Sequence, residues 1–314
     1  MVKFIINRLL LLIPLMLGVS IIVFIMLYCG PNDPALSYVR LSGIPPTDEA
    51  IKAAQHALGL DRSLPVQYFS WLWNALHLDF GKSFTTGVPV TEHLLLYLPN
   101  TLYLAAVSML MTILISVPLG ILSAVYKDRV PDHVCRIVSY IGVATPSFWL
   151  AFLLILLFSI KLKWLPPMGF GGITYVLMPA FTAAFMSLCI NMRLIRGNML
   201  DQLHTRHILY ARIRGVKESI ILKDHIFRNS LIPVITVMGM HLGEILGGAV
   251  IAEIVFAWPG LGRFALNAIN NRDFPVVQCF VLVMTFIFVI CNLVTDILYA
   301  MLDPRIRLGG GHHD

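Results

Sequence analysis

The chain alternates long apolar runs with short polar connections, and each run has the length of a membrane-spanning helix. About 20 apolar residues are enough to cross the hydrocarbon core of a bilayer as an α-helix. The runs of this length lie at 9–27, 102–125, 137–160, 173–192, 232–255 and 276–299. The pattern predicts an all-α polytopic membrane protein with six transmembrane helices.

The first apolar run follows two basic residues, Lys3 and Arg8, as the apolar region of a signal peptide would. It is longer than such a region, however, and no small-residue cleavage site follows it. We therefore expect residues 1–30 to form an uncleaved transmembrane helix with a cytoplasmic N-terminus.

Residues 31–100 are polar to amphipathic, and acidic side chains outnumber basic ones there. Aromatic residues of this stretch, such as Trp71 and Trp73, suit the headgroup level of a membrane. We expect an extracytoplasmic insert of short helices, then a transmembrane core at 101–302 and a cytoplasmic tail at 303–314.

The segment 193–233, between the fourth and fifth apolar runs, is the most basic part of the chain. Loops rich in Lys and Arg stay on the cytoplasmic side of a membrane, so alternating spans place both termini there too. Every basic region is flanked by spans, which predicts contact with membrane lipid and no binding of nucleic acid. The basic residues of the segment are Arg193, Arg196, Arg206, Arg212, Arg214, Lys217, Lys223 and Arg228.

Composition supports a membrane protein and argues against an enzyme. Hydrophobic residues make up 58% of the chain and charged residues 13%, whereas a soluble domain carries about 25% charge. The sequence shows no phosphate-binding glycine loop, no nucleophile–base arrangement and no C-x-x-C pair, so we expect no cofactor bound by this chain. His312 and His313 could hold a metal, although terminal histidines are usually unstructured.

Within the basic segment, Gly215 separates two helical patterns. Leu209 and Ile213 lie four residues apart, as do Ala211 and Gly215, so each pair shares a helix face. This predicts a helix, a glycine turn and a second helix. The small pair would let another protein approach the backbone closely, while the alternative is an ordinary basic cytoplasmic loop.

The fifth run carries ionisable side chains, which are costly inside a membrane and usually face protein or a water-filled path. A helical wheel places Met238, His241 and Glu244 on one face. These donors suit a borderline transition metal such as Ni²⁺ in transient contact, or else a His–Glu bond that only fixes packing. The opposite face carries a small-residue ridge for helix packing, made of Gly239, Gly243 and Gly247.

The stretch YARIRGV…RNSLIPVI resembles the cytoplasmic loop by which permease subunits of bacterial binding-protein-dependent ABC importers dock onto their ATPase. That loop carries Glu-Ala-Ala, then Gly and a later Leu-Pro. Ala211, Gly215 and Pro233 match it, whereas Leu209 and Tyr210 replace the Glu and the first Ala. The resemblance implies a coupling surface shaped by the matching small residues, with Arg212 and Arg214 meeting acidic groups of the ATPase.

Two further stretches resemble the same family. ALGLD…DFG in the insert resembles its peptide and nickel branch, and GMHLGE in the fifth run followed by FAWPGLGRFALNAINNRDFPVVQC is most like its nickel-importing permease. The resemblance implies a type I ABC importer permease fold and alternating access. It also implies a second permease subunit, two ATPases that use ATP and Mg²⁺, and an extracytoplasmic binding protein.

Three alternatives to a nickel permease remain open. A di- or oligopeptide permease of the same family differs mainly in lacking the charged pair His241 and Glu244. A secondary transporter or channel working alone would lack the docking loop, and the sequence shows no inverted repeat or paired broken helices. A purely structural anchor would not explain ionisable groups inside a span.

Overall fold

The computed structural model describes most of the chain as helices joined by short loops. Among the described residues the only strand-like pairing is an isolated bridge between Lys82 and Pro89. The tail, with His312 and His313, lies outside the described residues. Those described are 2–28, 30, 33–203, 205–217, 220–221, 226 and 228–302.

The chain divides into two compact units. One, the core unit, comprises 1–5, 102–258 and 290–314, and the other, the insert unit, comprises 6–101 and 259–289. The predicted insert therefore folds in one unit with most of the first span. The helices, in chain order, are α1 (Val2–Tyr28), α2 (Pro34–Leu41), α3 (Asp48–Ala57), α4 (Leu64–Leu76), α5 (Val90–Val125), α6 (Val130–Ala144), α7 (Ser147–Leu154), the π-helix η1 (Ile155–Lys161), α8 (Ile173–Leu203), α9 (Arg206–Ile213), α11 (Arg228–Val255), α12 (Leu261–Asn271) and α13 (Phe274–Leu302).

Among the described residues, five helices are long and apolar enough to span a membrane, and a bent helix pair brings the number to six when it is taken as one span. This confirms the all-α, multi-pass prediction. The straight spans lie within α1, α5, α8, α11 and α13, and the bent pair is α6 followed by α7 and η1.

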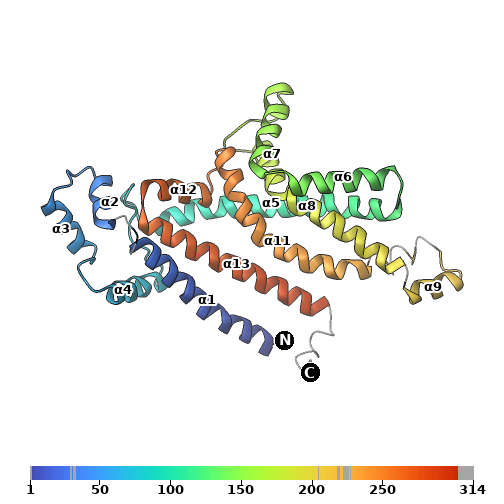
Figure 1. Cartoon of the computed structure of the whole chain (residues 1–314), viewed down its shortest axis with the longest axis horizontal. Helices are drawn as coiled ribbons and strands as arrows, with labels where there is room; N and C mark the ends of the chain where they lie inside the picture. The colour runs from blue at the N-terminus through green and yellow to red at the C-terminus, as the bar shows by residue number, and fades with distance from the viewer. Residues whose placement is uncertain are drawn as a thin grey trace. The chain divides into compact units, whose positions relative to one another are not determined.

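The prediction for the third span, 137–160, needs a correction: it is not one straight helix, since its two parts meet at 112°. The bend lies at Thr145 and Pro146, where Thr145 is extended with ψ 121°. Proline has no amide hydrogen and disfavours a helical conformation in the residue before it. The helix therefore ends at Ala144 and restarts at Ser147 in a new direction, visible where α7 leaves α6 in Figure 1.

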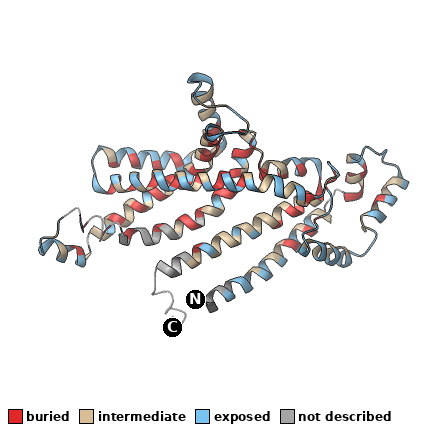
Figure 2. Cartoon of the chain, turned by 180° about the vertical axis from the view of Figure 1, so that it is seen from behind, coloured by how far each residue is buried: buried red, intermediate tan, exposed pale blue. Residues whose placement is uncertain are grey.

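The core unit is built around α8 and α11, which pack along each other and carry many of the buried residues in Figure 2. Ala180 of α8 shares one buried cluster with Ala252 of α11. Ile195 and Met199, nearer the end of α8, share a second cluster with Val234, near the start of α11. The two helices therefore run antiparallel.

In the insert unit, a buried carboxylate holds the loop before α5. Asp273, which precedes α13, accepts hydrogen bonds from the Ser83 hydroxyl at 2.6 Å and from the backbone N–H groups of Phe84 at 3.0 Å and Thr85 at 3.1 Å. Asp273 directly precedes the first residue of α13. The backbone carbonyl of Asp273 does accept from the N–H of Val277, but its side chain bonds the distant loop.

Candidate functional site

The candidate site lies where α8 and α11 face each other. Gly248 of α11 lies against Ala183 of α8, because a Cβ built at Gly248 would be 4.0 Å from the Ala183 carbonyl oxygen. Antiparallel helices advance 1.5 Å per residue in opposite directions. Counting seven residues back along α11 and seven forward along α8 from this contact places His241 opposite Ile190, one residue before Asn191. His241 also shares a helical stripe with Gly248, toward α8.

His241 is held by the carboxylate one turn away. Its Nδ1 lies 2.5 Å from Oε2 of Glu244, and the His241 side chain is 4% exposed against 56% for Glu244. Its other ring nitrogen, Nε2, is buried and has no partner in the part of the chain that the structure describes. When Nδ1 donates to an ionised Glu244, Nε2 keeps a lone pair. Carboxylate–histidine pairs of this kind orient imidazoles toward metals.

Asn191 on α8 is the polar residue that sequence reasoning missed. It is fully buried, and neither its Oδ1 nor its Nδ2 has a partner among the described residues. It shares a stripe with Ala180 and Ala184, three and two turns earlier on α8. Its signal was present as a lone amide in the apolar run 173–192. A buried polar group left unpaired costs about 1–3 kcal/mol, so this level of the helix pair has unmet hydrogen-bonding capacity.

Met238, the third predicted member of this face, is buried and belongs to an apolar cluster with Ile195 and Met199. Its thioether is therefore packed within protein one turn from His241. Among the described residues no three His, Cys, Asp or Glu side chains come together as a metal cluster. The described residues thus bring an imidazole and an amide to one level of the helix pair, with the thioether packed among apolar side chains and no preformed cage of charged ligands.

The three predicted packing glycines have different surroundings. A Cβ at Gly239 would collide with the side chain of Thr295 on α13, so these helices approach closely there. Gly243 is half-buried, and Gly247 is exposed with nothing within 4 Å of a built Cβ. Within this chain, α13 therefore covers the glycine ridge at Gly239, whereas no described residue covers it at Gly247.

The predicted glycine turn closes α9. Gly215 has φ +73°, its N–H donates to the Arg212 carbonyl at 3.0 Å, and the N–H of Val216 donates to the Ala211 carbonyl at 3.1 Å. These two bonds define a Schellman motif, whose left-handed residue is usually glycine. Ala211 is half-buried, while Arg212 and Arg214 are exposed.

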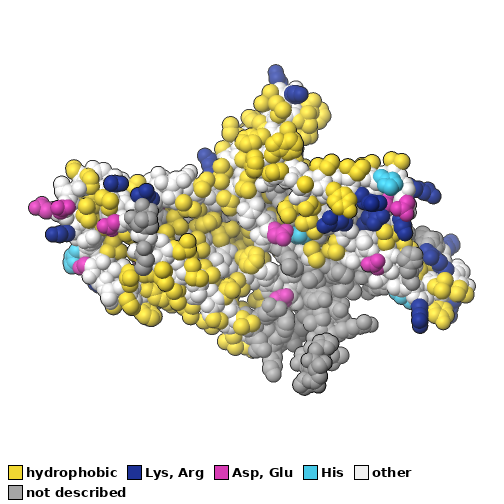
Figure 3. Space-filling view, viewed as in Figure 1, with side chains coloured by type: hydrophobic (Ala, Val, Ile, Leu, Met, Phe, Trp, Pro, Cys, Tyr) yellow, Lys and Arg dark blue, Asp and Glu magenta, His cyan; other side chains and the backbone are white. Residues whose placement is uncertain are grey.

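The α9 surface combines apolar and basic side chains. Leu209, Tyr210 and Ile213 are 60%, 67% and 72% exposed, and Lys and Arg gather around α9 in Figure 3. The second helix, predicted to follow Gly215, is described only in part: Ile220 is helical and Leu231 belongs to α11. Four residues of this stretch lie outside the described residues, namely Glu218, Lys223, Asp224 and Phe227. The described part is a short helix with an exposed apolar row and basic neighbours.

A helical bundle with several spans, polar groups buried between two of them, and an exposed basic helix at a loop describes a membrane transport subunit. Comparison with known families makes this specific. The family described as "Binding-protein-dependent transport system inner membrane component" matches residues 116–308, and its N-terminal membrane component matches 1–105. The chain belongs to this family of multi-pass ABC importer permeases, with the type I importer fold.

Relatives match along nearly their whole length but differ in the solute that their names give. The chain is 39% identical to a probable D,D-dipeptide transport system permease of Escherichia coli, over 94% of each protein. It is 37% identical to a metal-staphylopine import system permease of Staphylococcus aureus and 37% identical to a glutathione transport system permease of Salmonella choleraesuis. Each of these two alignments covers 98% of this chain and 99% of the relative.

Proposed function

We propose that the chain forms part of the pathway for nickel, as the ion or a chelate, in an ATP-driven importer. The observation that carries this is the buried Nε2 of His241, oriented by Glu244 and without a partner among the described residues. Imidazole nitrogen suits nickel, and the contact must be weak because a conduit has to release what it binds. Asn191 would complete the polar level on the facing helix.

The proposed transporter contains a second permease, two ATPases and an extracytoplasmic binding protein. ATP closes the ATPases, which push on α9 and its glycine turn and so open the pathway by alternating access. In this scheme Leu209 and Ile213 enter a groove of the ATPase, Arg212 and Arg214 meet its acidic groups, and both termini are cytoplasmic. ATP and Mg²⁺ are used by the ATPases.

Peptide import is the second candidate, and the names of two relatives, which mention a dipeptide and glutathione, favour it. In that case His241 and Glu244 would serve helix packing, and Asn191 would meet peptide amides.

Uptake of radioactive nickel by cells with and without this chain tests the proposal, with peptide uptake measured in parallel. We expect loss of nickel uptake alone. His241→Ala should lower that uptake while the transporter complex still assembles. Loss of peptide uptake with nickel unaffected would reject the nickel proposal and support the peptide permease.

A further inference from the structure

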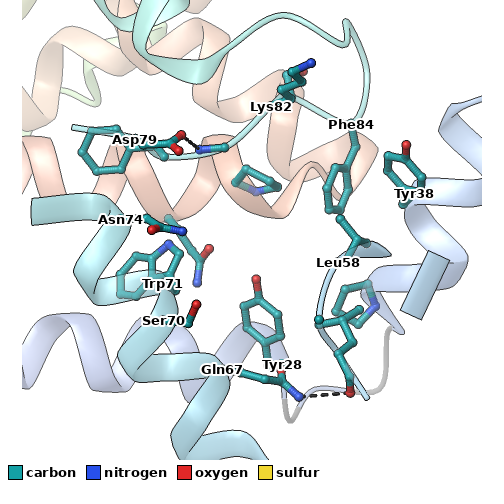
Figure 4. Close-up of a pocket in the computed structure, with 18 of the residues that line it drawn as sticks. Tyr28, Tyr38, Leu58, Gln67, Ser70, Trp71, Asn74, Asp79, Lys82 and Phe84 are labelled. Atoms are coloured by element: carbon teal, nitrogen blue, oxygen red, sulfur yellow. Dashed lines mark hydrogen bonds between the residues drawn. The ribbon is translucent and has the colours of Figure 1, made fainter. Parts of the chain in front are cut away.

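The insert unit contains a cavity that the proposed transport mechanism does not use. Its volume is about 450 Å³, within the range of small-molecule sites. The end of α1, α2, α4, the loop 79–84 and the start of α13 all contribute to its wall. Figure 4 labels side chains from α1, α2, α4 and this loop around the central space. The aromatic part of the wall is Phe24, Tyr28, Tyr38, Trp71, Phe80 and Phe84.

Charged side chains of both signs also line the cavity. Arg62 and Lys82 supply positive charge, and Asp79 supplies negative charge. All three are exposed at the residue level. One oxygen of Asp79 accepts from the backbone N–H of Gly81 at 2.9 Å, which fixes the carboxylate in place. A wall with both signs suits a zwitterion better than a simple anion or cation.

Two lining residues have unmet hydrogen-bonding capacity of opposite kinds. The indole Nε1 of Trp71, a donor, and Oε1 of Gln67, an acceptor, are both buried and have no partner among the described residues. The Gln67 amide is held in place because its Nε2 donates to the carbonyls of Leu60 at 3.1 Å and Arg62 at 2.7 Å. Trp71 is half-buried, and its ring lies beside those of Phe24 and Tyr68, with centroids 6.2 and 6.1 Å away.

The wall formed by the loop is held firmly. Asp273 binds Ser83 and the backbone of Phe84, and the Phe84 ring meets Tyr38 edge to face with centroids 5.3 Å apart. A binding wall that is ordered before the ligand arrives lowers the entropy cost of binding. The aromatic surface is therefore presented in advance.

We propose that this cavity binds a small amino-carboxylate of about dipeptide size, either a free peptide or a metal chelate of that class. Trp71 donates to a carboxylate oxygen, with Lys82 and Arg62 supplying charge. An ammonium or amide N–H of the ligand donates to Gln67 or Asp79, and an apolar side chain packs on the aromatic wall. The inference rests on the proposed function, in which this end of α1 and α13 is extracytoplasmic, and makes the cavity a receiving site for imported solute.

The test measures binding of radiolabelled alanyl-phenylalanine to the intact transporter in detergent, by equilibrium dialysis without ATP. A second ligand, the same dipeptide amidated at its C-terminus, lacks the negative charge of the carboxylate. Trp71→Phe keeps an aromatic ring and removes the N–H. Trp73→Phe is the matched control, because Trp73 is 66% exposed and does not line the cavity.

We expect the natural chain to bind the free acid and to bind the amidated dipeptide about tenfold more weakly, because one charge-assisted hydrogen bond is lost. Trp71→Phe should bind the free acid about tenfold more weakly for the same reason. Trp73→Phe should bind it as tightly as the natural chain does. Competition by nickel nitrilotriacetate would identify a chelate as an accepted source of the carboxylate, and lack of competition would identify the peptide. Equal binding of acid and amide, full affinity in Trp71→Phe, or complete displacement of the dipeptide by added phospholipid would overturn the proposal. Because no transport is measured, failed nickel uptake with intact dipeptide binding would reject the proposed cargo alone.

Discussion

Arg196 of α8 donates two hydrogen bonds to the Asp132 carboxylate at the start of α6, over 2.6 and 2.7 Å. The hydroxyl of Ser123, near the end of α5, donates a third at 2.6 Å, and the backbone N–H of Asp128 a fourth at 2.9 Å. Asp132 is fully buried. One carboxylate thus ties three helices of the core unit together.

Breaking this ion pair should destabilise the core unit strongly. Asp132→Ala leaves the Arg196 guanidinium without its carboxylate, and removing one partner of a buried pair costs about 3–5 kcal/mol. Thermal unfolding of the purified protein in detergent measures the loss. Arg193→Ala, on the same helix but at an exposed position, should change the midpoint little, and an equal loss in both variants would contradict the assignment.

The unpaired amide of Asn191 allows a structural role to be separated from a transport role. Asn191→Leu replaces it with an apolar side chain of similar shape, which removes buried unpaired atoms at little packing cost. We expect unchanged or higher thermal stability together with reduced nickel uptake. A variant that loses stability and complex assembly in proportion would show that Asn191 serves packing.

Two glycines of α11 offer a matched pair. Gly239→Ala places a methyl group against Thr295, and overpacking of this kind costs about 1–3 kcal/mol. Gly247→Ala meets open space, so the same change there should leave the unfolding midpoint unchanged or slightly higher. If both variants lowered the unfolding midpoint equally, the close contact between Gly239 and α13 would not explain the loss of stability.

The turn after α9 can be tested through its backbone. A residue with a side chain at Gly215 pays about 1–2 kcal/mol for the left-handed conformation, even though a Cβ there meets nothing within 4 Å. Gly215→Leu should abolish nickel uptake while the chain still inserts into the membrane. Gly197→Leu in α8, which also has open space around a built Cβ, should transport normally, and normal uptake by the Gly215 variant would refute the coupling role.

The sequence predicted helices well because apolar length alone determines which segments can cross a bilayer. It also contained Pro146, the cause of the break in the third span, but one proline does not give the angle at which the two halves meet. The glycine turn at Gly215 was predictable because a Schellman motif is local and needs only a few neighbouring residues.

Long-range relationships were not predictable in the same way. A helical wheel puts Gly239 and Gly247 on one face, yet only the arrangement of α13 decides which of them is covered. Asn191 looked like one polar residue among apolar ones until the register of α8 against α11 placed it beside the level of His241. The hydrogen bond between Asp273 and Ser83 joins positions 190 residues apart, and no local sequence pattern predicts it.

That last bond has a consequence for biogenesis. The loop around Ser83 is synthesised early, whereas its anchoring carboxylate arrives only just before the final helix. In the proposed topology the insert would emerge outside the membrane and wait for most of translation with its polar backbone groups exposed to water. Its aromatic cavity would take its final form only when the last span enters the bilayer. In a chain truncated before Asp273, the loop around Ser83 should therefore lack its anchoring hydrogen bonds. We expect limited proteolysis from the extracytoplasmic side to cut such a chain near Phe84.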